Sequence, residues 1–182
     1  MDSQPTLILA APAHLLIFSA DSRKNATILL GSAPAYIISK DPIDFCTELR
    51  AAGTGQALAQ ITWRDVLPDV ITFPQINATE MHLRKWLQKA ALPNGSLAHI
   101  MDTGYGQFIL KTHPVHRLAL FHEGDLQTPV AYWQSDATAP VALVIQARVC
   151  PDVQVHIIAA FIVREFKLRM RKKANQVVLI NR

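Results

Sequence analysis

The feature that most constrains the fold is an apolar strand that leads directly into the longest helix of the chain. Residues 141–147 are almost wholly apolar, which is typical of a central strand that is covered on both faces. Pro151-Asp152 then opens a helical pattern over residues 153–173. Ile157, Phe161 and Leu168 lie on one side of this helix, so we expect it to dock on a sheet through that face.

Further strands and helices are expected along the chain. Runs of β-compatible residues predict strands at 6–10, 14–19, 26–30, 36–39, 107–111, 117–122 and 176–180. Asp41-Pro42 and Asn77, each followed by helical patterns, predict helices over 41–52 and 77–92, and a short helix is expected at 96–101. Strands that alternate with helices predict an α/β fold, a mixed and partly parallel β-sheet flanked by helices.

The chain is expected to divide near residue 60. Residues 1–60 are predicted to form a small β-rich extension of strands plus one helix, and residues 61–182 a larger α/β domain. The formal net charge is +4, but it is unevenly distributed. Residues 164–182 hold seven Lys or Arg and one Glu, a local charge of +6, whereas residues 1–159 carry a charge of −2. Basicity is therefore a property of the C-terminal helix, where Arg164, Lys167, Arg171 and Lys172 share one side.

The two cysteines and the N-terminal residues bear on the compartment. Cys46 and Cys150 are too few for a disulfide framework and too isolated for a zinc site, so we interpret both as buried residues in a reducing compartment. The apolar stretch 7–20 contains Pro12 and His14 and is too short to span a bilayer. A cytoplasmic protein without membrane association is expected.

Seven histidines provide the main candidates for chemistry, since a nucleophile elbow and a metal-ligand spacing are both lacking. The informative stretch is Thr103-Gly104-Tyr105-Gly106, followed by a short apolar run that ends at His113. Glycines in a tight turn can direct backbone N–H groups outward, and these can stabilise the oxygens of a phosphoryl group while an imidazole attacks phosphorus. The stretch therefore indicates a candidate phosphoryl site, with no cofactor or metal required.

The order of motifs resembles the enzyme IIA domains of the fructose, mannitol and nitrogen-related class of the bacterial phosphoenolpyruvate-dependent phosphotransferase system. The resemblance covers about residues 61–175. Thr103, Gly104, Gly106, Ile109 and His113 fall on the family's active-site pattern. Downstream motifs similar to those of the family are Asp136, Pro140-Val141, Pro151 and the helix that begins around His156.

The resemblance implies an enzyme IIA-like sandwich fold and roles for particular residues. His113 would accept a phosphoryl group from the phosphocarrier protein HPr as a phosphohistidine, and His156 would help to hold that group. Thr103, Gly104 and Gly106 would bind the phosphoryl oxygens, and Lys111 would replace an arginine of the family. A regulatory protein is implied, with an HPr-like carrier or another regulatory protein as partner.

Departures from the family keep a second hypothesis open. Thr112 stands where the family usually has proline, and the stretch ahead of Thr103 lacks the family's Arg-Glu pair. These differences favour a catalytically degenerate interaction module that binds a protein partner through the N-terminal unit or the basic C-terminal helix. Nucleic-acid binding through that helix is a weaker alternative, because no aromatic residues are interleaved with its basic residues.

Overall fold

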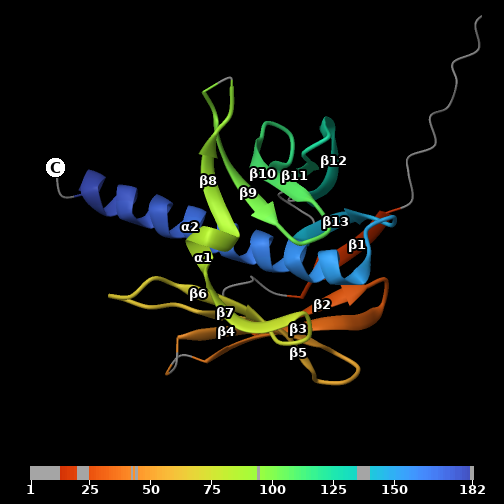
Figure 1. Cartoon of the computed structure of the whole chain (residues 1–182). Coiled ribbons are helices and arrows are strands. Elements are labelled where there is room, and N and C mark those ends of the chain that lie inside the picture. The colour runs from red at the N-terminus through yellow and green to blue at the C-terminus, as the bar shows by residue number, and fades with distance from the viewer. Residues whose placement is uncertain are drawn as a thin grey trace, which may run out of the picture.

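A single antiparallel sheet surrounds one long helix in the computed structural model of the chain (Figure 1). The structure describes residues 13–19, 25–41, 43, 45–93, 95–134 and 140–180, with side chains described as far as residue 171. The strand expected at 6–10 and Asp136 lie outside the described residues. Within this part of the chain the sheet has thirteen strands, in the order β7-β6-β5-β4-β3-β2-β1-β13-β12-β11-β10-β9-β8.

The strands in the first half of the chain form one side of the sheet. They are β1 (Ala13–Phe18), β2 (Ala26–Leu30), β3 (Ala33–Asp41), β4 (Cys46–Ala51), β5 (Ala57–Thr62), β6 (Val70–Phe73) and β7 (Asn77–His82). Each of these strands pairs with the next in antiparallel register, as in a series of hairpins. The domain boundary expected near residue 60 falls inside β5, and strands from both sides of that boundary share the one sheet.

The remaining strands continue the sheet from its other edge. They are β8 (Leu87–Ala91), β9 (Leu97–Asp102), β10 (Gln107–His113), β11 (Arg117–His122), β12 (Asp125–Gln134) and β13 (Ala142–Gln146). Antiparallel pairing of β1 with β13 joins the two halves. The edge strands β7 and β8 are connected by the one-turn helix α1 (Leu83–Trp86). The sheet therefore bends around the central helix with both edges close to α1 (Figure 1).

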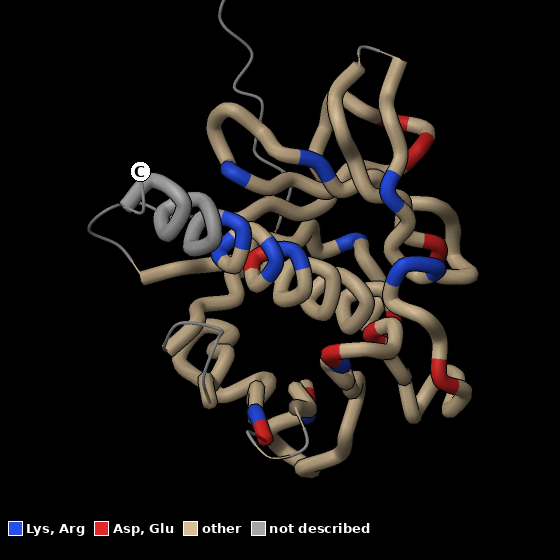
Figure 2. Tube along the Cα trace, turned by 90° about the vertical axis from the view of Figure 1, so that its left-hand side faces the viewer, with Lys and Arg blue, Asp and Glu red and all other residues tan. Residues whose placement is uncertain are grey.

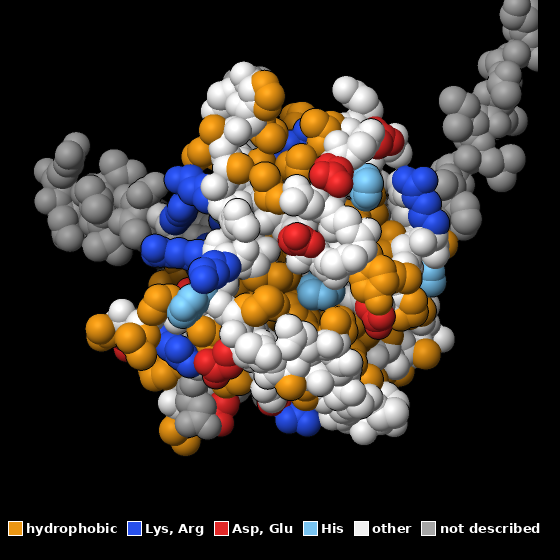
Figure 3. All heavy atoms as spheres, viewed as in Figure 1, with side chains coloured by type: hydrophobic (Ala, Val, Ile, Leu, Met, Phe, Trp, Pro, Cys, Tyr) orange, Lys and Arg blue, Asp and Glu red, His pale blue; other side chains and the backbone are white. Residues whose placement is uncertain are grey.

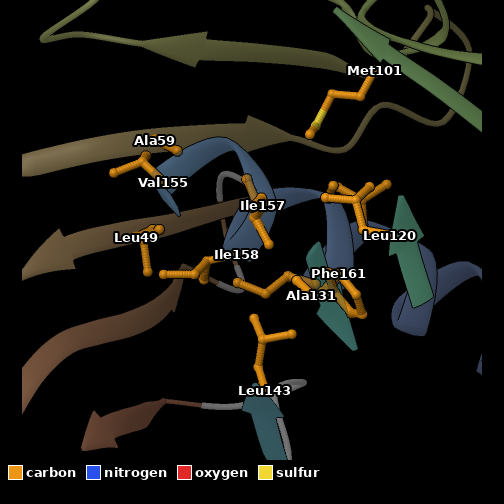
Figure 4. Close-up of a cluster of buried hydrophobic side chains, with 14 of the residues drawn as sticks. Leu49, Ala59, Met101, Leu120, Ala131, Leu143, Val155, Ile157, Ile158 and Phe161 are labelled. Atoms are coloured by element: carbon orange, nitrogen blue, oxygen red, sulfur yellow. The ribbon is translucent and has the colours of Figure 1, made fainter. Parts of the chain in front are cut away.

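The core lies between the concave face of the sheet and helix α2 (Pro151–Ile180). Residues 155–165 of α2 are buried on every side of the helix, as expected for a helix that is enclosed and not laid on a surface. Figure 4 shows Ile157, Ile158 and Phe161 of α2 among apolar side chains from strands of both halves. The Phe161 ring stacks on Trp133 of β12, with 5.9 Å between ring centroids.

Several predicted elements are confirmed. The strands expected at 14–19, 26–30, 36–39, 107–111, 117–122 and 141–147 correspond to β1, β2, β3, β10, β11 and β13, and the helix expected at 153–173 is α2. The helices expected at 41–52, 77–92 and 96–101 are wrong, because those residues form mostly strands of the sheet. The strand expected at 176–180 is also wrong, since α2 continues through these residues.

The predicted fold class is wrong as well. All thirteen strands of the described chain pair in antiparallel fashion, so the sheet is not mixed or partly parallel, and it is not flanked by layers of helices. An enzyme IIA-like α/β sandwich is therefore excluded, and the resemblance to that family of the phosphotransferase system is contradicted. Physically, the intervening segments are too short to form the crossover helices that parallel strands require.

Candidate functional site

His113 lies at the end of β10, beside a second histidine. Its Nδ1 accepts hydrogen bonds from the backbone N–H groups of Val115 and His116, at 3.2 and 3.3 Å. The His113 ring stacks on the His116 ring with 5.1 Å between centroids, and His116 stacks in turn on Tyr132 at 4.0 Å. The Nδ1 atom of His113 is therefore occupied by hydrogen bonds that close the turn between β10 and β11.

Lys111 shares a face of the sheet with His113. Strand pairing is regular here, with Lys111 opposite Ala119 and His113 opposite Arg117, and alternate residues of a strand lie on the same face. The Lys111 ammonium lies 4.2 Å from the centroid of the Phe121 ring, and the His113 ring is 6.3 Å from the same ring. These two predicted site residues are therefore brought together.

His156 lies in a different environment, inside the core on α2. It is only 4% exposed, and its Nδ1 accepts a 3.2 Å hydrogen bond from the Trp86 indole N–H. Its ring centroid is 4.0 Å from that of Phe73. Burial lowers the pKa of His156 to about 4, so the ring is neutral near pH 7. The hydrogen bonds and ring contacts of His156 share no residue with those of His113.

The turn at Thr103–Gly106 connects β9 to β10 and satisfies its own polar groups. The Thr103 hydroxyl donates to the Gly106 carbonyl at 3.1 Å and accepts from the Tyr105 N–H at 3.2 Å. The Gly104 N–H donates to the Asp102 carboxylate at 3.0 Å. Gly104 has φ of 76°, a conformation that favours glycine. The glycine pattern thus fits a hairpin turn whose Gly104 and Tyr105 amides already have acceptors.

A basic pocket that the sequence only partly indicated lies between α2 and the segment from α1 to β9. Its volume is about 400 Å³. The residues that line it are Leu83, Arg84, Leu87, Lys89, His99, Val163, Arg164, Lys167 and Arg171. Figure 2 shows Lys and Arg positions concentrated along this part of α2, and Figure 3 shows their side chains gathered beside the point where the helix emerges.

The positive charge of this basic pocket is largely uncompensated. Five of its lining residues are Lys or Arg, and none of the described lining residues is acidic. Lys167 pairs with Asp69, with 3.2 Å between Nζ and Oδ2. Within the described part of the chain no carboxylate is within ion-pair distance of the other four cations. Like charges that line one pocket repel one another, and the charge of Arg171 lowers the pKa of Arg164 accordingly.

Arg164 is the most deeply placed of these cations. It is 7% exposed, and its Nε has no hydrogen-bond partner among the described residues. Burial lowers the pKa of the Arg164 guanidinium, and the neighbouring Arg171 lowers it further. A buried cation without a carboxylate partner costs free energy, and an anion at the part of Arg164 that lines the pocket would offset this cost. The geometry therefore suits an anion that reaches into the basic pocket as far as Arg164.

The charges of the pocket also affect the pKa of His99, which lies on β9. Burial is the largest cause that lowers its pKa to about 4, and the charges of Arg164, Arg171, Lys167 and Lys89 lower it further. At neutral pH His99 is therefore an uncharged hydrogen-bonding group in a wall of cations. An anion in the basic pocket would oppose those cations and would raise the pKa of His99 toward its ordinary value.

The sequence predicted one wall of this pocket and missed the other. The expected basic side of the C-terminal helix is confirmed for Arg164, Lys167 and Arg171, which all line the pocket; the side chain of Lys172 lies outside the described residues. His99 is one of the seven candidate histidines, but the sequence does not point to Arg84 or Lys89 or to a site that these three residues share, because the pattern predicts helices for the segments that carry them. Only the sheet topology brings them opposite α2.

A larger cavity, of about 540 Å³, lies at the start of α2. It is bordered by Phe108, Val130 and Val153 together with the Tyr105 hydroxyl, which donates to the Asp152 carboxylate at 2.9 Å. This hydrogen bond raises the pKa of Tyr105. The side chains of Tyr105, His122 and Asp125 already have hydrogen-bond partners, so the geometry points less directly to a ligand than the basic pocket does.

Other expectations from the sequence have varied outcomes. Cys150 is exposed and Cys46 is half-buried, so the expectation that both cysteines are buried is wrong. Among the described residues no group of three or more His, Cys, Asp or Glu side chains is placed to hold a metal ion. None of the helices that the structure describes is both long and apolar enough to cross a membrane.

Comparison with known proteins gives a family but no activity. No curated protein and no solved structure matches the chain. The match that is found contradicts membership of the phosphotransferase system, which the order of motifs had suggested. Residues 21–170 match a family of unknown function, DUF6593, and since this is most of the chain, the protein belongs to that family.

Proposed function

We propose that the protein is a non-catalytic interaction module that binds an acidic segment of a protein partner in the basic pocket. The observation that carries this proposal is the buried Arg164, whose Nε has no hydrogen-bond partner in the described chain and which lines the pocket together with four further cations. A carboxylate is the complementary group, since guanidinium and carboxylate form paired, charge-assisted hydrogen bonds. Binding would remove the repulsion between cations that the free module tolerates.

The pocket walls favour a carboxylate on an aliphatic stem. Leu83, Leu87 and Val163 line the pocket together with Arg164 and supply apolar surface. The two methylene groups of a glutamate side chain would pack on these residues, while its carboxylate contacts the guanidinium. A free inorganic phosphate would leave the apolar walls without a contact. An acidic peptide therefore uses more of the pocket than a small inorganic anion does.

Removing two cations from the rim should weaken the binding of an acidic peptide. Arg84 and Lys89 are exposed, so the double variant Arg84→Gln/Lys89→Gln should fold normally. We expect its affinity for fluorescein-labelled hexaglutamate, measured by fluorescence anisotropy, to fall about tenfold at about 50 mM salt, with a smaller difference at about 500 mM. The wild-type protein should bind this peptide measurably and with a strong dependence on salt.

A neighbouring cation provides the matched control. Lys85 is also exposed and follows Arg84 in the chain, but it borders a different cavity, beside Glu80 and Asp102. Lys85→Gln should therefore leave hexaglutamate binding within about twofold of wild type, since it alters the net charge but not the pocket. Equal losses in Lys85→Gln and in the rim variant would contradict the proposal, as would an absence of binding by the wild-type protein.

Replacing Arg164 should raise the stability of the protein but weaken the binding of an acidic peptide. Arg164→Met keeps most of the side-chain volume and removes a buried charge that has no counter-ion in the described chain. We expect the free energy of unfolding in urea to rise by about 1 kcal/mol. Hexaglutamate affinity should fall by about a hundredfold, because the charge-assisted contact is lost. A variant that is less stable than wild type, or that binds equally well, would be evidence against this assignment of Arg164.

A further inference from the structure

An exposed apolar loop lies between β5 and β6. Val66 and Leu67 are at its tip, where they are 95% and 63% exposed. Single exposed apolar residues are common, but two successive ones at a loop tip leave a contiguous apolar surface in water. This surface, Val66–Leu67, is called the apolar tip below. Its position relative to the basic pocket decides its significance.

The C-terminal end of the loop is attached to residues of the pocket. The Asp69 carboxylate pairs with Lys167, and the Asp69 backbone carbonyl accepts a 2.8 Å hydrogen bond from the Leu83 N–H. Lys167 and Leu83 both line the pocket. The Asp69 carboxylate also accepts from the Arg64 N–H at 3.2 Å, which closes the loop around the apolar tip. The C-terminal end of the loop therefore lies at the basic pocket, and the apolar tip is two to three residues from Asp69 along the chain.

The N-terminal end of the loop is held against the same helix. The Trp63 ring packs on the Phe166 ring of α2, with 4.4 Å between centroids. The Trp63 indole N–H donates to the Thr47 hydroxyl at 3.0 Å. Because both ends are fixed to α2 or to residues that contact it, the loop has little conformational freedom to lose when a partner binds. An exposed apolar tip on a loop that is anchored at both ends is suited to recognition of a partner.

We infer that the pocket and the apolar tip form one recognition surface, which fits an acidic protein segment that carries an apolar side chain next to its carboxylates. This inference rests on the proposed function, since the acidic residues of that segment occupy the basic pocket. Charge complementarity selects an anionic occupant, and the aliphatic walls and apolar tip select a peptide with hydrophobic side chains. A flat anionic lipid surface would place its phosphates at the rim, away from the recessed Arg164.

The test compares two peptides of equal charge. Hexaglutamate and a hexaglutamate extended by two leucines are titrated against the full chain by fluorescence anisotropy. We expect the leucine-containing peptide to bind wild-type protein about tenfold more tightly, since burying two apolar side chains contributes this much even when burial is incomplete. In the variant Val66→Ser/Leu67→Ser the two peptides should bind with equal affinity, and plain hexaglutamate should bind as it does to wild type.

An exposed apolar residue elsewhere serves as control. Val115 lies in the turn between β10 and β11 and is exposed, so Val115→Ser should preserve the tenfold preference. If wild-type protein binds hexaglutamate but the leucines add nothing, the inference is overturned and the proposed function stands. If neither peptide binds, both fail. Binding to phosphatidylserine vesicles that depends on Val66 and Leu67, without a preference for the leucine-containing peptide, would overturn the inference in favour of a lipid surface.

Discussion

Replacing Glu165 with alanine is expected to lower the free energy of unfolding by about 3–5 kcal/mol. Glu165 is fully buried on α2, and its carboxylate pairs with Arg169 and, at 3.2 Å, with Arg117. Alanine would leave two guanidinium groups without this counter-charge in or near the core. In thermal unfolding followed by circular dichroism, the midpoint should fall by roughly 10 °C for a chain of this size.

The matching substitution at an exposed ion pair should have little effect. Glu80 pairs with Arg64 at 3.2 Å on the surface, where solvent screens the interaction. Glu80→Ala should therefore change the free energy of unfolding by no more than about 0.5 kcal/mol. Similar losses for the two variants would show that the burial of Glu165 does not have the consequence expected here.

A double-mutant cycle measures how much of the stability lost in Glu165→Ala depends on Arg117. Arg117 follows the turn between β10 and β11 with φ of 54°, and its pairing with Glu165 attaches that hairpin to α2. In an Arg117→Ala background, Glu165→Ala should cost at least about 1 kcal/mol less than in wild type, because one unpaired cation has already been removed. Additive losses would mean that the two residues stabilise the fold independently.

Strands and the central helix were predictable where burial dictates the residue types. The strands β11 and β13 are nearly continuous apolar runs, and such runs are recognisable without knowledge of their neighbours. Helix α2 begins at the predicted Pro151 and is apolar on all sides where the sheet encloses it. These features are local properties of the sequence.

The wrong helices have a specific physical cause. The sequence pattern predicts N-caps at Asp41 and Asn77, but their side chains accept hydrogen bonds from the N–H groups of Ile43 and Thr79, at 2.8 and 2.9 Å, beside strands. These are side-chain turns beside strands, made by the same donors and acceptors that cap helices. The same residue types form helix N-caps and side-chain turns, so these residues alone do not distinguish a helix from a strand. The outcome depends on whether the residues that follow pair with a neighbouring strand.

The spacing of apolar residues after residue 82 predicts a long helix, and this prediction is wrong for a related reason. Leu83, Trp86 and Leu87 are all buried, as the helical pattern requires. Only one turn of helix forms, however, and the chain then continues as the edge strand β8. Three buried residues over five positions are compatible with both structures. The misassigned segment carries Arg84 and Lys89, which is why half of the basic pocket could not be located from the sequence.

Acidification should destabilise the fold through His156. Its pKa is about 4 in the folded chain and about 6.5 for a histidine exposed by unfolding. Between these values the unfolded chain binds more protons than the folded chain, so stability is fully present above about pH 6.5 and falls as the pH decreases toward 4. We expect a loss of about 3 kcal/mol over this window from His156, with His99 adding to it in the same direction.

The measurement is urea denaturation at a series of pH values from about 7 to about 4, in wild type and in His156→Gln. Glutamine retains an acceptor for the Trp86 indole N–H but does not titrate. The free energy of unfolding of His156→Gln should therefore fall less steeply as the pH decreases, and the difference in slope from wild type should correspond to about one proton. The same substitution at His82, an exposed position on β7, measures the effect of replacing a histidine outside the core. Parallel curves for wild type and His156→Gln would show that His156 is not the group whose protonation opposes folding. A shallower curve for His156→Gln would identify the buried imidazole, enclosed between the sheet and α2, as a principal source of acid sensitivity.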